Sequence, residues 1–433
     1  MMDGRKMKIR ILTLAAVLST MSLTALAQQT AVPELGASVD NLASTHSAPF
    51  RVIDPKQLVQ ISEDSVHDNL AVQTTFGNEE ASVKPFAGPG LPIFIYTSGA
   101  NTGSIVGTAP GNAITTTVPT VVVPVVLNIT QGGTLFSFNP TATDPGCLGG
   151  ANTAISLVGG SPFFQSVPIT MNGVNEGVTQ YIDAFQRAEF ATTVNANNHT
   201  LLSGVLGPTL TISVNAPAGG SATAAVFGLN GTQCGTNPGP VNRHAVLAVI
   251  NINTINAILQ NYIAANGIQP SQLPFFVLYN SVISNGAANN LANCCILGFH
   301  TSIGGTVANP GQTYGISTFE GRNQTVFGGV SDVSVIAHEL AEWADDPSGV
   351  NPTPAWGGIG QVAGCQGNLE VGDPMSGILA PSIVVGGFTY HFQELAFFSW
   401  FYRDAPSQGA GGKYSSNGTF AGFSKNCPPG GTF

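Results

Sequence analysis

A stretch of seventeen residues, 331–347, reading SDVSVIAHELAEWADDP, constrains the fold of this chain more than any other. Its apolar residues recur with the three-and-four spacing of one helix face packed on a core, and the serine and aspartate that open it can cap a helix. His338 and Glu342 lie four residues apart, so their side chains leave the same face one turn from each other, with Asp345 a further turn along. The spacing predicts a short buried helix with a histidine and two carboxylates on one face.

The segment HELAE, which contains His338, Glu339 and Glu342, resembles the metal-binding helix of the zincin metallopeptidases, which reads His-Glu-x-x-His. Glu339 lies about 100° round the helix axis from His338, where its carboxylate can act on a metal-bound water. Glu342 replaces the second histidine of the pattern, so the metal centre gains a negative charge and should acidify a bound water less. The resemblance implies a divalent metal, with zinc as the first expectation and calcium or manganese as alternatives.

A third metal ligand has to come from outside the helix. In the gluzincin branch of the zincins it is a downstream glutamate, followed by an aspartate that orients the first histidine. Glu370 lies 28 positions after Glu342, and Asp373 follows it in NLEVGDP. The resemblance therefore implies His338, Glu342 and Glu370 as metal ligands, Asp373 as the orienting residue, and Glu339 as the general base of a peptide hydrolysis.

Two histidines outside the helix leave the third ligand open. His300 in GFHTS and His391 in TYHFQE could each replace Glu370 as a ligand, or could stabilise an oxyanion as an electrophile. A histidine that only completes a hydrogen-bond network is the simpler alternative for both.

A second resemblance covers about residues 275 to 350. A strand, a cysteine shortly before Gly298-Phe299-His300, and a helix that ends in an acid before Pro347 are together similar to the phosphate-induced (Exordium-type) family of secreted proteins. No known reaction comes with that family. The resemblance implies, as an alternative to a hydrolase, a non-catalytic extracellular or cell-surface protein with a structural cation such as calcium.

The start of the chain predicts export. Residues 1–27 begin with four basic residues, continue in an apolar run and end in Ala-Leu-Ala, which is the pattern of a secretory signal peptide cleaved after Ala27. No later apolar run is long enough, and free enough of Pro, Gly and polar residues, to span a bilayer. We therefore expect a secreted or periplasmic protein.

Cysteine usage agrees with an oxidising compartment. An exported chain with six cysteines can form up to three disulfides, whose pairing the sequence does not give. Neighbouring residues rarely reach disulfide geometry, so the adjacent pair is expected to bond to other segments. The cysteines are Cys147, Cys234, Cys294, Cys295, Cys365 and Cys427.

Changes in composition divide the rest of the chain into three parts. Residues 28–90 hold eight acids and end in a Pro/Gly cluster, which predicts a leader or propeptide-like segment. Residues 91–240 alternate short Val/Thr/Ile-rich strands with turns and predict a β-rich lobe. Residues 241–433 read as strand, helix, strand and then the metal-type helix, an α/β lobe. The fold class predicted is α+β, and the first resemblance implies a zincin-like architecture.

Composition also excludes several function classes. The net charge is −10, and ten acids fall between Glu320 and Asp404, so nucleic acid is not an expected partner. There is no Gly-x-Ser-x-Gly elbow, no phosphate-binding loop and no dinucleotide-binding glycine pattern. The expected function is a metal-dependent hydrolase of peptides or proteins.

Overall fold

The computed structural model describes residues 51–53, 58, 60, 90–230, 234, 245–425 and 427. The predicted signal peptide at 1–27 lies outside these residues, as does nearly all of the predicted leader at 28–90. In the part of the chain that is described, no helix is both long and apolar enough to cross a membrane.

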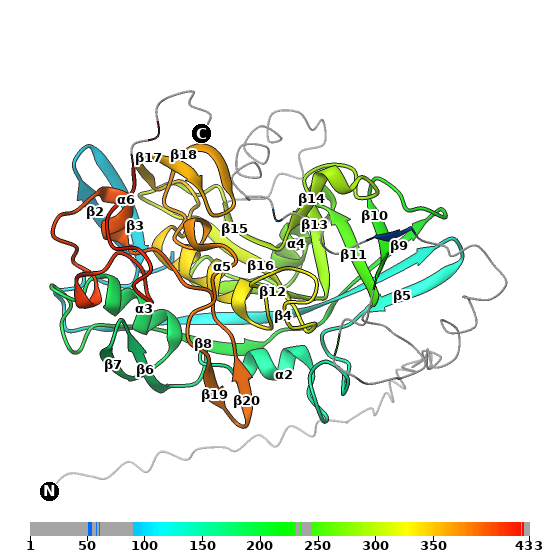
Figure 1. Cartoon of the computed structure of the whole chain (residues 1–433), viewed down its shortest axis with the longest axis horizontal. Helices are drawn as coiled ribbons and strands as arrows, with labels where there is room; N and C mark the ends of the chain where they lie inside the picture. Colours follow the sequence, from blue (N-terminus) through cyan, green and yellow to red (C-terminus); the bar gives the residue numbers. More distant parts are fainter. Residues whose placement is uncertain are drawn as a thin grey trace, which may run out of the picture.

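Two mixed sheets form the centre of the molecule (Figure 1). In the seven-stranded sheet the long strand β4 (Thr115–Gln131) pairs with β12 (Leu273–Tyr279), β8 (His199–Leu206), β9 (Leu210–Ala216) and β5 (Thr134–Phe138), and the sheet continues from β12 to β16 (Gln312–Phe319) and β15 (Gly298–Ile303). The five-stranded sheet runs in the order β1 (Val52–Ile53), β10 (Ala224–Leu229), β11 (Val246–Asn251), β13 (Ser281–Ser284) and β14 (Cys294–Ile296).

Both sheets cross the boundary at residue 240 that the sequence predicted between two lobes. β4 pairs in parallel with β12, and β10 pairs antiparallel with β11. The chain is a strand-rich α+β protein, in agreement with the predicted class, and its β-rich and α/β parts share their sheets.

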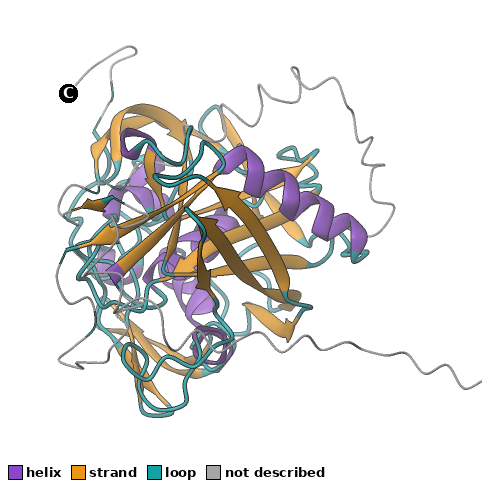
Figure 2. Cartoon of the chain, turned by 90° about the vertical axis from the view of Figure 1, so that its right-hand side faces the viewer, coloured by secondary structure: helices purple, strands orange, loops and turns teal. Residues whose placement is uncertain are grey.

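Helices cover both faces of the larger sheet because its strands are apolar on both sides. On β12, Phe275 and Val277 join the core cluster that contains helix α5 (Ser334–Asp345), whereas Phe276 and Leu278 join the cluster that contains α4 (Ile252–Ala265). Figure 2 shows the strands running through the middle of the molecule with helices on both sides. Helix α5 is thereby held between the sheet and helix α3 (Tyr181–Glu189).

Small elements surround this centre. Four hairpins form two-stranded sheets, and two short α-helices and a 3-10 turn complete the part that positions the site. The hairpins are β2 (Ile93–Ser98) with β3 (Asn101–Val106), β6 (Val167–Met171) with β7 (Val174–Thr179), β17 (Pro352–Ile359) with β18 (Val362–Asn368), and β19 (Ile383–Val385) with β20 (Phe388–Tyr390). The helices are α2 (Ala154–Gly159), α6 (Phe398–Tyr402) and the turn η5 (Asp373–Met375).

Three disulfides join all six cysteines: Cys147–Cys234, Cys365–Cys427 and Cys294–Cys295. The prediction that the adjacent cysteines bond to other segments is therefore wrong. The peptide between them is cis, and their Cα atoms are 3.0 Å apart.

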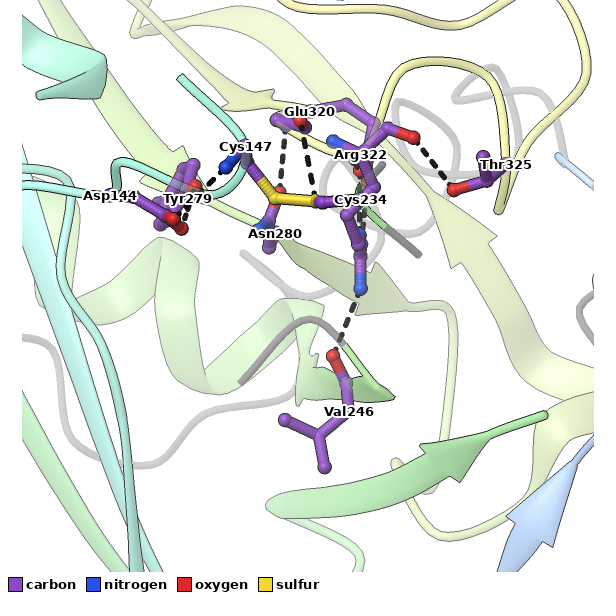
Figure 3. Close-up of a disulfide and its surroundings, with 10 residues drawn as sticks. Asp144, Cys147, Cys234, Val246, Tyr279, Asn280, Glu320, Arg322 and Thr325 are labelled. Carbon is purple, nitrogen blue, oxygen red and sulfur yellow. Dashed lines mark hydrogen bonds and ion pairs between the residues drawn. A yellow bond between two sulfur atoms is a disulfide. The ribbon is translucent and has the colours of Figure 1, made fainter. Parts of the chain in front are cut away.

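A buried ion pair lies beside the Cys147–Cys234 disulfide (Figure 3). Arg322 and Glu320 are 0% and 1% exposed, and the guanidinium donates to both carboxylate oxygens, from Nε at 2.6 Å and from Nη2 at 2.5 Å. Its Nη1 donates to the carbonyl of Val246 at 2.9 Å. The pair thereby links the segment after β16 to the first residue of β11.

Candidate metal site

Helix α5 lies entirely in the core. All twelve of its residues are buried, among them His338 and Glu339, which are 2% exposed, and Glu342, which is 0% exposed. The predicted helix at 331–347 is present, but it begins at Ser334 and no side chain caps it. The carboxylate of Asp332, one of the two predicted caps, instead accepts from the Val333 amide and from His391.

One group of possible metal ligands centres on His338. Its Nε2 lies 3.0 Å from Oε2 of Glu342 and 3.4 Å from Oδ1 of Asp373, and these three side chains can hold a metal ion. The other carboxylate oxygen of Glu342 accepts the Gly372 amide at 2.9 Å, which fixes the loop that delivers Asp373. The i, i+4 pair predicted from the sequence therefore forms, and a residue from a distant loop completes it.

The other ring nitrogen of His338 is occupied. The Gln393 side chain donates through Nε2 to the Gly372 carbonyl at 2.6 Å, and its Oε1 and Nε2 lie 3.2 Å and 3.0 Å from Nδ1 of His338. Metal binding through Nε2 of His338 requires the tautomer in which Nδ1–H donates to Oε1. In that tautomer Nε2 presents a lone pair to the carboxylates of Glu342 and Asp373. Metal-binding histidines are commonly oriented in this way, by an oxygen that accepts the outer N–H.

A second group shares Glu342. Nδ1 of His300 lies 3.8 Å from Oε2 of Glu342 and 3.9 Å from Oε2 of Glu339, and this triplet can also hold a metal ion. Nε2 of His300 donates to the Asp346 carbonyl at 3.0 Å. Burial lowers the pKa of His300 to about 4, so the ring is neutral at pH 7 and Nδ1 faces the carboxylates as an acceptor.

The downstream acids do not take the positions that the resemblance implied. Asp373, expected to orient a ligand, belongs to the His338 group, whereas Glu370 is fully buried and belongs to neither group among the described residues. His391 also lies outside both groups. Its Nδ1 is 2.5 Å from Oδ2 of Asp332, whose Oδ1 accepts the His391 backbone amide at 2.9 Å.

The remaining carboxylate on the helix turns away from the site. Asp345 is hydrogen-bonded to Glu189 on α3 and accepts from Gln186 at 3.4 Å. Burial raises the pKa of Asp345 to about 7 and raises that of Glu189 well above its ordinary value, so the two carboxyl groups share a proton near neutrality. Asp345 therefore joins two helices and is not a ligand of either group.

Two glycines allow the backbone to approach the site. A Cβ at Gly372 would lie 2.4 Å from the imidazole of His338, and a Cβ at Gly298 would lie 2.4 Å from Oε1 of Glu339. Gly372, Gly298 and Gln393 were missed as site residues from the sequence. The only signal was position: Gly372 lies inside NLEVGDP, Gly298 opens GFHTS, and Gln393 follows His391 by two residues.

Comparison with known proteins gives no relative. No family model, no curated protein and no solved structure matches this chain.

Proposed function

We propose that this chain is an exported, metal-dependent hydrolase of peptides with a zincin-like architecture, whose cation is bound by His338, Glu342 and Asp373. One observation carries the proposal: Nε2 of His338 faces two carboxylates while Gln393 occupies the other ring nitrogen. Nε2 of His338 and the carboxylates of Glu342 and Asp373 converge in a buried place, where a positive charge offsets the cost of burying two carboxylates. A neutral imidazole and two carboxylates form a donor set that zinc accepts.

Burial supports a cation rather than a solvated acidic face. His338, Glu342 and Asp373 are at most 2% exposed, and two carboxylates this close together in a dry interior favour a cation beside them. Without a metal, burial lowers the pKa of His338, but Glu342 and Asp373 outweigh it and raise the pKa well above its ordinary value. A proton and a metal ion thus compete for the same nitrogen.

The neighbouring residues then have distinct roles. A divalent cation bound here would polarise a substrate carbonyl and acidify a water. Glu339, which follows the ligand His338, accepts the proton of the attacking water. His300 stays neutral, and its Nδ1 is an additional nitrogen that could bind the metal on the Glu342 side of the site. His391 lies outside both groups, and its ion pair with Asp332 makes it the candidate we test as a source of positive charge for the oxyanion.

Metal content tests the ligand set. The chain purified without chelator should contain one divalent cation, and both His338→Ala and Asp373→Asn should lose it, as measured by inductively coupled plasma mass spectrometry. Glu370→Gln is the matched control, because Glu370 is equally buried and lies three residues before Asp373. Metal lost from Glu370→Gln and kept in Asp373→Asn would restore the ligand set that the gluzincin resemblance implies.

The closed surroundings of the site favour a second candidate, a non-catalytic extracellular protein with a structural cation such as calcium. Adding chelator to the same preparations separates the two. A hydrolase should lose turnover of an internally quenched peptide library when the cation is removed, and regain it when zinc is restored. A fall in melting temperature with no turnover in either state favours the structural cation. No metal in any preparation contradicts both.

The pKa of His391 provides a test of its role. The hydrogen bond that His391 donates to Asp332 raises this pKa above the ordinary value for imidazole, so His391 keeps its proton to higher pH than a free histidine. Asp332→Asn should return the pKa toward about 6.5, as measured by NMR titration of the imidazole. The alkaline limb of the activity profile should move to lower pH in parallel. An unchanged limb would remove His391 from the mechanism.

A further inference from the structure

A cavity of about 350 Å³ lies between two hairpins. Its walls come from strand β6, from Tyr181 of α3, from the segment leading into β19, and from a C-terminal turn (residues 168–171, 181, 380–384, 416 and 417). None of these residues carries a charge, and the lining mixes hydroxyl and amide groups with apolar side chains. In Figure 1 both hairpins lie along the lower side of the molecule. The cavity therefore fits an uncharged ligand with hydrogen-bonding groups.

The two hairpins present backbone groups toward neighbours. Each has a two-residue turn with positive φ, Asn172-Gly173 and Gly386-Gly387, and their closing pairs are Met171↔Val174 and Val385↔Phe388. In a two-residue hairpin the two residues that close the turn exchange hydrogen bonds with each other. The residue before the closing residue on the first strand therefore points its N–H and C=O away from the partner strand, toward the outer edge of the hairpin. Those residues are Thr170 and Val384, and both line the cavity.

Within the described part of the chain, no further strand pairs with the outer edge of either hairpin. Among the described residues β6 pairs only with β7, and β19 pairs only with β20. Open strand edges accept a further strand through main-chain hydrogen bonds. An extended residue occupies roughly 3.3 Å by 4.8 Å by 10 Å, so the cavity volume corresponds to about two residues of an added strand.

Tyr181 connects the cavity to the metal site. Its hydroxyl donates to the Gln393 carbonyl at 3.2 Å, and its ring stacks on Phe392 with centroids 4.1 Å apart. The side chain of the same Gln393 contacts Nδ1 of His338. A ligand held in the cavity is thus one residue away from the segment that orients the metal-binding histidine.

We infer that the cavity binds an uncharged, extended segment of the polypeptide substrate, hydrogen-bonded to the edges of β6 and β19 at Thr170 and Val384. The class of ligand rests on the proposed function, since a peptidase needs a place for residues beyond the bond that it cleaves. Peptide binding can be measured separately from hydrolysis, so the two can fail independently.

The test uses the full metal-loaded chain carrying Glu339→Gln, so that bound peptide is not cleaved. The probe is a fluorescein-labelled, end-blocked hexapeptide of alanine, valine and threonine, followed by fluorescence anisotropy. Thr170→Arg, at an exposed position, should weaken binding at least about tenfold by adding bulk and charge at the β6 edge. Val178→Arg is the control, because Val178 is 69% exposed on the partner strand and does not line the cavity. It should bind within about twofold of the parent chain.

A second probe needs no substitution in the protein. The same peptide methylated on every backbone nitrogen has no N–H left to pair with a strand edge, and should bind at least about tenfold more weakly. Equal binding of both peptides, or by Thr170→Arg and the parent, would overturn the inference. Hydrolysis of peptides without any effect of Thr170→Arg on KM would overturn it while leaving the proposed function intact. If Thr170→Arg and the methylated peptide both bind more weakly as expected, but the unmodified chain hydrolyses no peptide, the result would support peptide binding in the cavity and contradict the proposed peptidase activity.

Discussion

If the proposed mechanism holds, Glu339→Gln lowers the rate of peptide hydrolysis by about 10²–10⁴-fold and leaves the metal content unchanged. The amide has nearly the shape of the carboxylate, so the buried side chain is replaced without a cavity, but it cannot accept a proton at neutral pH. The measurement is kcat/KM on an internally quenched peptide, together with the metal content of the variant.

Glu176→Gln provides the matched control for that prediction. Glu176 is a buried glutamate, 8% exposed, in hairpin strand β7 and outside both ligand groups, so its variant should keep the parent rate. Unchanged hydrolysis by Glu339→Gln would exclude Glu339 as the base. Loss of the metal along with activity would instead make Glu339 a ligand, together with His300 and Glu342.

Arg322→Met should destabilise the folded chain by about 3–5 kcal/mol. Methionine fills much of the same volume, but it leaves the buried Glu320 carboxylate without its cation and the Val246 carbonyl without its donor. The measurement is urea unfolding with the disulfides intact, followed by tryptophan fluorescence. The effect is large because removing one partner of a buried pair exposes the full desolvation cost of the other.

The double variant Glu320→Gln/Arg322→Met separates charge from packing. It no longer buries a lone carboxylate, so it should recover more than half of the stability that Arg322→Met loses. A loss below about 1 kcal/mol in the single variant would mean that Glu320 is solvated in the folded chain, and would contradict the buried ion pair.

The helix of the site could be predicted from sequence because its information is local. Apolar spacing over 331–347 and the four-residue separation of His338 and Glu342 follow from helix geometry alone, and the structure places both side chains in one group. The same reasoning fails for Asp345, which it placed on the face of the helix that carries His338 and Glu342. It follows the same spacing, yet it faces Glu189 on α3, and no local pattern reveals which helix packs there.

The rest of the candidate site depends on contacts between distant segments. Which of Glu370 and Asp373 reaches the ligand group depends on how their loop packs against helix α5. There the amide of Gly372 donates to Glu342, and the Cα of Gly372 lies against the ring of His338. Gln393 reaches His338 across 55 positions. The Cys294–Cys295 bond was mispredicted because neighbouring cysteines rarely reach disulfide geometry, and no local pattern marks this pair as an exception.

The central place of β4 also determines when the chain can complete its fold. Pro124 of β4 and its partner Val277 of β12 lie 153 positions apart, and the pairing is parallel. Two strands so far apart in sequence pair slowly, because the entropic cost of closing the loop between them comes before any contact stabilises it. The first half of the chain therefore cannot finish its sheet until β12 has been synthesised, and until then the edge of β4 that binds β12 is open and prone to aggregation. Such a chain depends on being kept apart from its neighbours while it folds, and neither half would be a stable product alone.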